Sequence, residues 1–169
     1  MTALLVHPSG PLRGETRLPG DKSLSHRAVL FGALAEGDSQ IRGFLPAHDC
    51  QATVVCVRAL GVDVMEDDAT TLTIRGHGLR GLQAPAAPLH CARSGTTLRL
   101  LAGMLAGQPF DSVLTGDPQL RRRPMQRITV PLRAMGAQIA DTDGHAPLVI
   151  RGSPLHGAEH TLRIASALA

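Results

Sequence analysis

Aromatic side chains and long apolar stretches are what this sequence has least of. Its only aromatic residues are three Phe, with no Trp and no Tyr, so it lacks the stacking platforms that single-strand nucleic-acid binders use. No stretch approaches the roughly 18–20 consecutive apolar residues of a membrane span. The N-terminus has no basic segment and its apolar run covers only residues 3–6, which argues against a secretory signal peptide.

Cysteine and metal-ligand patterns are also scarce. The three cysteines, Cys50, Cys56 and Cys91, form an odd set without metal-ligand spacing, which favours a reduced cytoplasmic protein over a disulfide scaffold. The eight histidines show no spacing typical of a metal site, so we predict none. We interpret His26 as a structural residue rather than a ligand.

What is present suits a soluble α/β protein. The 169 residues are 43% hydrophobic, which is enough for the core of one domain built from Ala, Leu, Val and Ile. The net charge of +3 comes from 17 basic and 14 acidic residues. That modest excess does not by itself indicate a nucleic-acid partner.

Residues 21–27 (Asp-Lys-Ser-Leu-Ser-His-Arg) combine cationic and hydroxyl side chains where a turn at Pro19-Gly20 gives way to a helix. Ser23 and Arg27 are four residues apart and share one face of the first turn. Free backbone N–H groups and the positive end of the helix dipole suit an anion such as phosphate there. The alternative is an Asp or Ser N-cap surrounded by solvated charges.

The sequence repeats itself at intervals of about 70–76 residues. Each unit is expected to read strand, helix, strand, helix, strand, strand, and each first helix starts with small hydroxyl residues. The final strands of the two units are followed by Arg75-Gly76 and Arg151-Gly152. We predict two βαβαββ repeats over residues 14–152, and the truncated start of a third over residues 153–169. The chain is therefore expected to be a fragment of a longer protein.

A second basic segment covers residues 116–125 and contains Arg121, Arg122 and Arg123. Pro124 is predicted to occupy the first position of the next helix, where an Arg can aim its planar fork at carboxylate or phosphate oxygens. A solvated basic loop is the alternative. We interpret Asp49 as the N-cap of another helix rather than a general base.

Three segments, residues 18–27, 94–103 and 116–125, resemble the signatures of the 3-phosphoshikimate 1-carboxyvinyltransferase family, also called EPSP synthases. Enzymes of this family have two domains, each made of three repeats. The resemblance implies an α/β fold of α+β type, an inside-out α/β barrel that is truncated here. Residues 1–13 would then be the first strand of the other domain, and the rest of that second, C-terminal domain would be missing.

The resemblance implies transfer of the enolpyruvyl group of phosphoenolpyruvate to the 5-hydroxyl of shikimate 3-phosphate, with release of phosphate. Lys22 would be catalytic and would touch both substrates. Contacts with shikimate 3-phosphate would come from Lys22, Ser23, Arg27, Ser166 and Ala167. Contacts with phosphoenolpyruvate would come from Lys22, Gly95 and Arg123, with Thr96 and Arg99 as further candidates.

The family uses no metal or organic cofactor and works in the cytoplasm, and the parent is expected to be a monomer without nucleic-acid or membrane partners. The fragment alone is expected to be inactive. Two positions depart from the family pattern. Arg93 stands where the family commonly has Asn, and Leu168 stands where it has Gln.

Two other functions compete with this interpretation. A UDP-N-acetylglucosamine enolpyruvyl transferase shares fold and donor, but a sugar nucleotide needs no Ser/Arg pocket for a ring phosphate such as residues 22–27 offer. A nucleic-acid-binding α/β module could use Arg121–Arg123. The shortage of aromatics and the modest net charge argue against it.

Overall fold

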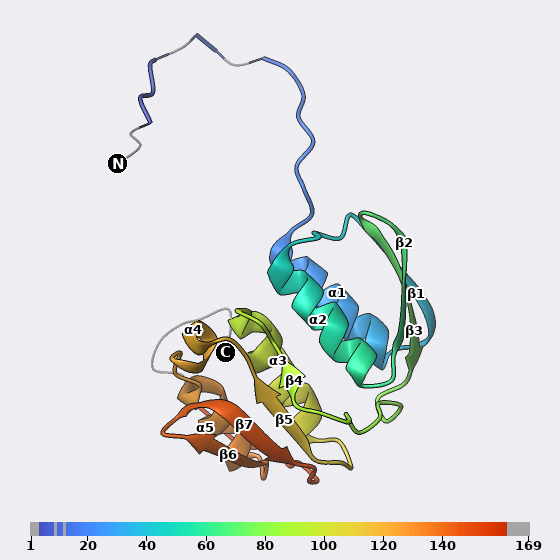
Figure 1. Cartoon of the computed structure of the whole chain (residues 1–169), viewed down its shortest axis with the longest axis vertical. Coiled ribbons are helices and arrows are strands. Elements are labelled where there is room, and N and C mark those ends of the chain that lie inside the picture. Colours follow the sequence, from blue (N-terminus) through green and yellow to red (C-terminus); the bar gives the residue numbers. More distant parts are fainter. Residues whose placement is uncertain (1–3, 9, 12, 162–169) are drawn as a thin grey trace.

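In the computed structural model, residues 4–8, 10, 11 and 13–161 are described, and two β-sheets flank a set of helices (Figure 1). The first sheet has the order β1-β3-β2 and is antiparallel throughout. Its strands are β1 (Glu36–Arg42), β2 (Asp63–Asp68) and β3 (Thr71–His77). The helices packed on it are α1 (Lys22–Leu34) and α2 (His48–Ala59).

The second sheet has the order β4-β5-β7-β6, with β4 parallel to β5 and the other pairs antiparallel. Its strands are β4 (Leu89–His90), β5 (Ser112–Thr115), β6 (Gln138–Thr142) and β7 (His145–Arg151). Its helices are α3 (Gly95–Ala106), the single-turn α4 (Pro118–Arg121) and α5 (Gln126–Ala134).

The helices form the middle of the molecule. Helix α2 contacts α3, so the two helix layers meet between the two sheets. The core is almost entirely aliphatic, as the composition predicts. Leu72 and Ile74 from the first sheet and Leu148 and Ile150 from the second are no more than 2% exposed. Alternate strand residues such as Val149 face outward, so helices lie inside and sheets outside. This is the inside-out arrangement that the resemblance implies.

The two units repeat the same plan, which confirms the repeated α/β fold. Helices α1 and α2 correspond to α3 and α5, and strands β1, β2 and β3 correspond to β5, β6 and β7. Each unit ends its second helix near a glycine of positive φ, Gly61 (+83°) or Gly136 (+93°). Glycine adopts this left-handed conformation without a Cβ penalty, so it ends a helix readily.

The two units differ at their first strand. Strand β4 opens the second unit, but no strand is assigned to residues 13–21, where the first unit was expected to begin with one. Strand β1 therefore has a single neighbour, β3, within the described residues.

Pro124 does not occupy the first position of a helix, so that prediction was wrong. Helix α5 begins at Gln126, with Met125 as its N-cap, and Pro118 takes the first position of α4 instead. The backbone N–H of Met125 donates to the carbonyl of Gly144 at 2.8 Å. This contact holds the chain against the β6–β7 turn, so the helix can begin only beyond it.

Candidate functional site

The entrance of α1 is fixed by three hydrogen bonds, two within its first turn and one to a distant segment. The carboxylate of Asp21 accepts from the Leu24 backbone N–H at 2.7 Å, which caps the helix. The Ser25 hydroxyl donates to the Asp21 carbonyl at 2.7 Å and accepts from the Leu45 N–H at 3.0 Å. Since Asp21 provides the cap, the side chains of Lys22 and Ser23 are exposed and available at this helix end.

Lys22 directs its ammonium to the carboxylate of Asp49, with which it forms an ion pair. The prediction that Asp49 is the N-cap of α2 was wrong. Ala47 is the cap residue, with no side-chain hydrogen bond, and Asp49 lies in the first turn of the helix. A cation at a helix N-terminus opposes the dipole, and a nearby carboxylate offsets that cost. The entrances of α1 and α2 are thus joined by a compensated charge pair.

The entrance of α3 is built around Gly95. The Ser94 hydroxyl caps the helix by accepting from the Thr97 N–H at 3.1 Å. A Cβ on Gly95 would lie 3.0 Å from Arg99 Nη1 and 3.2 Å from Arg123 Nη1. Glycine therefore lets two guanidinium groups from different segments close over the start of the helix, where free N–H groups and the dipole attract anions.

This arginine cluster (Arg99, Arg123 and Arg127) has no anionic partner among the residues that the structure describes. None of the ion pairs formed by the described residues includes these three side chains. Burial lowers the pKa of the Arg99 guanidinium from its ordinary value, and the positive charges of Arg127 and Arg123 lower it further. Its Nε is buried without a hydrogen-bond partner in the described chain. An anion bound here would relieve repulsion within the cluster, so the site favours negatively charged ligands.

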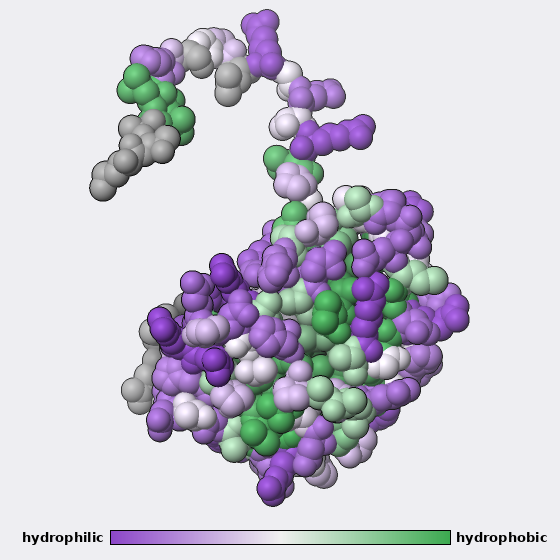
Figure 2. All heavy atoms as spheres, viewed as in Figure 1, coloured by the Kyte–Doolittle hydropathy of each residue, from purple (hydrophilic) through white to green (hydrophobic). Residues whose placement is uncertain are grey.

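The two entrances lie side by side. The Thr97 hydroxyl, in the first turn of α3, reaches the backbone carbonyl of Asp49 at 3.3 Å. The Lys22–Asp49 pair is thereby connected to the helix turn that carries Gly95. In Figure 2 several strongly hydrophilic side chains lie over the part of the molecule where Figure 1 places α4, and others are spread over the rest of this face.

Most residues predicted from the sequence lie in or next to these two entrances. Arg27, in the second turn of α1, and Thr96, in the first turn of α3, are both half-buried. Ser166, Ala167 and Leu168 lie outside the described residues, so their predicted positions stay predictions. Arg93 forms an ion pair with Asp117, its Nε 3.3 Å from the carboxylate.

Sequence analysis missed two contributors, Arg127 and the ion-pair role of Asp49. Arg127 follows Arg123 by four residues and stands in the first turn of α5, where the helix dipole disfavours a cation. A basic residue in that position was a signal for a bound anion. No local pattern pointed to the Lys22–Asp49 pair, because its members are 27 positions apart.

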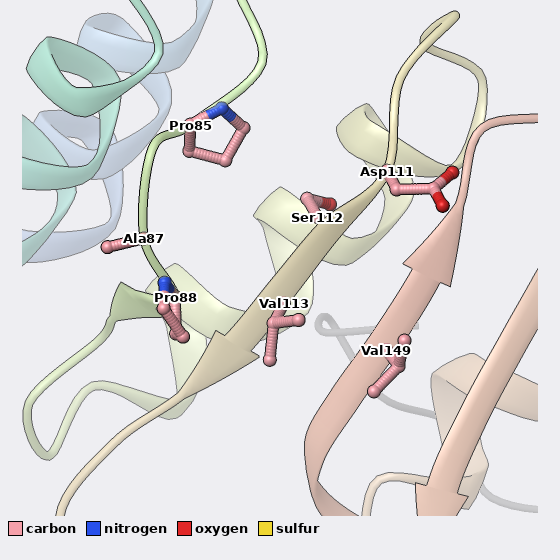
Figure 3. A pocket seen from close by; sticks show the side chains of 7 residues that line it. All are labelled: Pro85, Ala87, Pro88, Asp111, Ser112, Val113 and Val149. Atoms are coloured by element: carbon pink, nitrogen blue, oxygen red, sulfur yellow. The ribbon is translucent and has the colours of Figure 1, made fainter.

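The pocket in Figure 3 is a separate feature. It lies between the linker at Pro85–Pro88 and the outward-facing side chains Val113 and Val149 of β5 and β7. The neighbouring residues Leu148 and Ile150 are fully buried on the helix side of the sheet. The pocket thus opens on the opposite face of the sheet from the helices and is not part of the cationic site.

The fold and site together define a class: a repeat-built α/β protein that gathers cationic side chains at adjoining helix entrances. The family follows from comparison with known proteins. The model of the family EPSP synthase (3-phosphoshikimate 1-carboxyvinyltransferase) matches residues 6–169, and the chain belongs to this family.

Named relatives agree with this assignment. The chain is 55% identical over 167 residues to the 3-phosphoshikimate 1-carboxyvinyltransferase of Acidithiobacillus ferrooxidans, covering 99% of this chain and 39% of that protein. It is 59% identical over 158 residues to the Chloroflexus aurantiacus protein of the same name, covering 92% and 36%. The solved EPSP synthase of Acinetobacter baumannii superposes with a TM-score of 0.87 at 47% identity, over 92% of this chain and 36% of that one.

The chain thus spans 36–39% of the length of these curated relatives. The comparisons do not favour the UDP-N-acetylglucosamine transferase or the nucleic-acid-binding module. Within the described residues, no group of three or more His, Cys, Asp or Glu side chains could hold a metal ion. The helices of this part of the chain are all too short or too polar to cross a membrane.

Proposed function

We propose that this chain supplies the Lys22 and arginine-cluster half of a 3-phosphoshikimate 1-carboxyvinyltransferase active site. The substrates would be phosphoenolpyruvate and shikimate 3-phosphate, and the products would be the enolpyruvyl ether and inorganic phosphate. The observation that carries the proposal is the approach of Arg99 and Arg123 to Gly95, unopposed by any carboxylate in the described residues.

The charges suit phosphoenolpyruvate. That molecule carries a phosphate and a carboxylate close together, and guanidinium groups bind both through paired hydrogen bonds. The entrance of α3 adds backbone N–H groups that point at the same space. Shikimate 3-phosphate would lie toward α1, where Ser23 and Arg27 share one face with Lys22 close by.

Lys22 is suited to move a proton in the reaction. In the addition step the 5-hydroxyl oxygen bonds to C2 of the enol, C3 gains a proton and the hydroxyl loses its own. In the elimination step the C2–O bond to phosphate breaks and C3 loses a proton. An ammonium group can give up a proton and later regain it, and the Asp49 carboxylate holds the Lys22 ammonium until an anionic ligand competes for it.

A binding experiment tests the proposal on the chain itself. Phosphoenolpyruvate is titrated into the isotopically labelled chain, and the backbone amide signals of Gly95 and Lys22 are followed by NMR. Arg123→Gln is expected to weaken binding by at least about tenfold, because a charge-assisted hydrogen bond contributes about 1.5–3 kcal/mol. Arg121→Gln is the matched control, since it removes the same charge from the adjoining helix α4. Equal losses in the two variants would reject a specific site.

An activity experiment tests the chemistry. The chain alone is expected to show no turnover, because it spans only about 39% of its relatives. It is therefore joined to the remaining part of the Acidithiobacillus ferrooxidans relative, and phosphate release from both substrates is measured. Lys22→Met in this fusion should lower the rate by about 10²–10⁴-fold. Its melting temperature should hold, since an exposed ion pair contributes only about 0–1 kcal/mol. Near-normal turnover would show that Lys22 moves no proton.

We extend the proposal to the protein's setting. A biosynthetic enzyme of this kind would act in the cytoplasm as a monomer, with the remaining part of the two-domain enzyme as its only structural partner. Sedimentation analysis of the fusion would test the monomer, and a second copy contributing to the substrate site would contradict it.

A further inference from the structure

A chain of buried hydrogen bonds crosses three helices behind the candidate site. His26 Nδ1 of α1 lies 2.7 Å from the hydroxyl of Thr53 in α2. That hydroxyl lies 2.7 Å from the Thr97 hydroxyl of α3, which in turn lies 2.8 Å from the hydroxyl of Ser94. All four side chains are at most 1% exposed. We refer to His26, Thr53, Thr97 and Ser94 as the buried polar chain.

The donors and acceptors of the buried polar chain fix its direction. His26 Nε2 is buried and has no partner in the described part of the protein. An unpaired buried N–H costs more than an unpaired lone pair, so the ring proton belongs on Nδ1 and is donated to Thr53. Thr53 can then donate to Thr97, whose own proton is left for the Ser94 oxygen or the carbonyl of Asp49. The hydroxyls of Thr53 and Thr97 each donate one hydrogen bond and accept one, so the links depend on one another.

The ends of the buried polar chain lie next to the two entrances. His26 follows Lys22 by four residues and lies on the same side of α1. Thr97 follows Gly95 by two residues, and its hydroxyl also contacts the carbonyl of Asp49, the partner of Lys22. The contacts therefore run without a gap from the helix of Lys22, through α2, to the turn that carries Gly95.

We propose that His26, Thr53 and Thr97 are positioning residues, whose hydrogen bonds hold the Lys22 entrance and the Gly95 entrance at the separation that one pair of substrates requires. The inference rests on the proposed function for its ligands but not for its geometry. None of the three side chains needs to touch a substrate.

The buried polar chain fixes the relative positions of the helices more closely than apolar packing would. Leu or Val at these positions would fill the space and remove the desolvation cost of buried polar groups. Apolar contacts, however, are not directional and allow helices to slide or rotate by fractions of an ångström. Three linked hydrogen bonds of 2.7–2.8 Å are directional, and such a shift lengthens or misaligns them and so weakens them. Active-site geometry is sensitive to displacements of that size.

The test compares variants that keep each hydrogen bond with variants of similar shape that remove it. Thr97→Ser keeps the hydroxyl and Thr97→Val removes it. His26→Asn keeps a polar nitrogen near the position of Nδ1 and His26→Leu removes it. Phosphoenolpyruvate affinity, the melting temperature and the relative orientation of α1 and α3, taken from residual dipolar couplings, are measured for each variant of the chain.

We expect Thr97→Val and His26→Leu to bind phosphoenolpyruvate about 3–30-fold more weakly and to change the angle between α1 and α3. Thr97→Ser and His26→Asn should stay within about twofold of the unmodified chain. A lower melting temperature with unchanged affinity and unchanged helix orientation would overturn the proposal, because that is the result of a purely stabilising role. Should Thr97→Val not fold, His26→Leu decides the question in the same way.

The outcome separates this inference from the proposed function. If the unmodified chain does not bind phosphoenolpyruvate, the proposed function fails, and the dipolar couplings still judge the positioning role. A reorientation of α1 against α3 in Thr97→Val then supports that role, and an unchanged orientation rejects it.

Discussion

The first and second repeats share a scaffold and differ in the charges at their helix entrances. In the first repeat the Arg58 guanidinium donates to the Val64 carbonyl at 2.7 Å and to Glu66 at 3.1 Å. In the second repeat Arg133 makes the same pair of contacts, with the Ile139 carbonyl at 2.6 Å and Asp141 at 2.8 Å. Arg133, Ile139 and Asp141 each lie the same number of positions after their counterparts Arg58, Val64 and Glu66. These contacts tie the second helix of each unit to the strand that follows it.

The entrances differ in how their charge is balanced. In the first repeat Lys22 is a cation paired with Asp49, whereas in the second Arg99 and Arg123 both lie beside Gly95 and form no ion pair with any described carboxylate. A paired ammonium can exchange its partner for a ligand and can transfer a proton. Unopposed guanidinium groups remain charged and only bind. Under the proposed function, the duplicated framework would divide proton transfer and anion binding between its two copies.

Glycines at the ends of the closing strands, Gly76 within β3 and Gly152 just after β7, give the largest expected effect on stability. A Cβ on Gly76 would overlap the carbonyl oxygens of Gly32 and Ala35, and one on Gly152 would overlap the carbonyl of Gln108. Since backbone atoms cannot rotate away, Gly76→Ala and Gly152→Ala should each lower the free energy of unfolding by about 1–3 kcal/mol, toward the upper end of that range.

Gly103→Ala serves as the control for this pair. Gly103 lies within α3, and a Cβ there would meet no atom within 4 Å. That variant should gain about 0.5–1 kcal/mol through helix propensity. Urea unfolding checks all three, and equal effects in Gly76→Ala and Gly103→Ala would mean that the strand–helix contact is loose.

The contacts of Arg58 and Arg133 should give the next largest difference in stability between the two repeats. The Asp141 side chain is 12% exposed and the Glu66 side chain is 47% exposed. Arg133→Ala therefore strips a more buried carboxylate, and it should cost about 2–3 kcal/mol against about 1 kcal/mol for Arg58→Ala. Denaturant unfolding measures both, and the reverse order would mean that burial of the carboxylate does not set the cost.

The same pair predicts a pH dependence. Burial tends to raise the pKa of Asp141, but hydrogen bonds from the Gly144 N–H and from Arg133 outweigh it and hold the pKa below 3.8. A carboxyl whose pKa is depressed by folding contributes stability at neutral pH and loses it as the pH falls through the folded-state pKa. Arg133→Ala should therefore show a weaker loss of stability below pH 3.8. An unchanged acid profile would contradict this.

Removing the helix caps should produce smaller effects, unequal in the two repeats. Ser94 is 1% exposed, so Ser94→Ala leaves the Thr97 N–H buried without its acceptor. Asp21 is exposed, and water can replace its carboxylate at the Leu24 N–H. We expect the free energy of unfolding to fall by about 2 kcal/mol for Ser94→Ala and by about 0.5–1 kcal/mol for Asp21→Ala. Thermal unfolding of both variants checks the difference, which would vanish if water reached Ser94.

His26 should give the smallest effect. Burial lowers its pKa below 6.5, the Lys22 charge lowers it further, and Asp49 acts in the opposite direction. The unfolded chain therefore takes up a proton before the folded chain does, and stability should decline as the pH falls below 6.5. His26→Asn should lose this shallow dependence, as equilibrium unfolding between pH 5 and pH 7 would show. Arg99, at the equivalent position of α3, should contribute none over that range because an arginine stays charged.

Local patterns in the sequence were enough to predict the repeat and most elements. Periodic apolar residues located α1 and α5, alternating residues located β3, and the internal repeat then placed α3 and β7. The hydroxyl residues at two helix entrances, together with the arginine run, located the candidate site. These features depend on neighbours within a few residues along the chain.

Features that depend on distant parts of the chain could not be predicted. The start of α5 is set by the contact between Met125 and Gly144, the partner of Lys22 is 27 residues away, and His26 becomes a link only once Thr53 is beside it. The arginine run is ambiguous in the sequence alone. It becomes a site because Gly95 comes close to Arg123, and no spacing in the sequence carries that information.

The outer edge of β1 affects how two molecules of this chain could associate. β4 lies against β5, but the described residues place no strand against the outer edge of β1. Such an edge exposes unpaired N–H and C=O groups on which another chain could extend the sheet. In β1 only Ile41 is a large apolar residue, and Glu36, Asp38 and Arg42 carry charge. Pairing two such edges would bring few apolar side chains together, so the strand offers backbone hydrogen bonds without the hydrophobic surface that drives fibre growth.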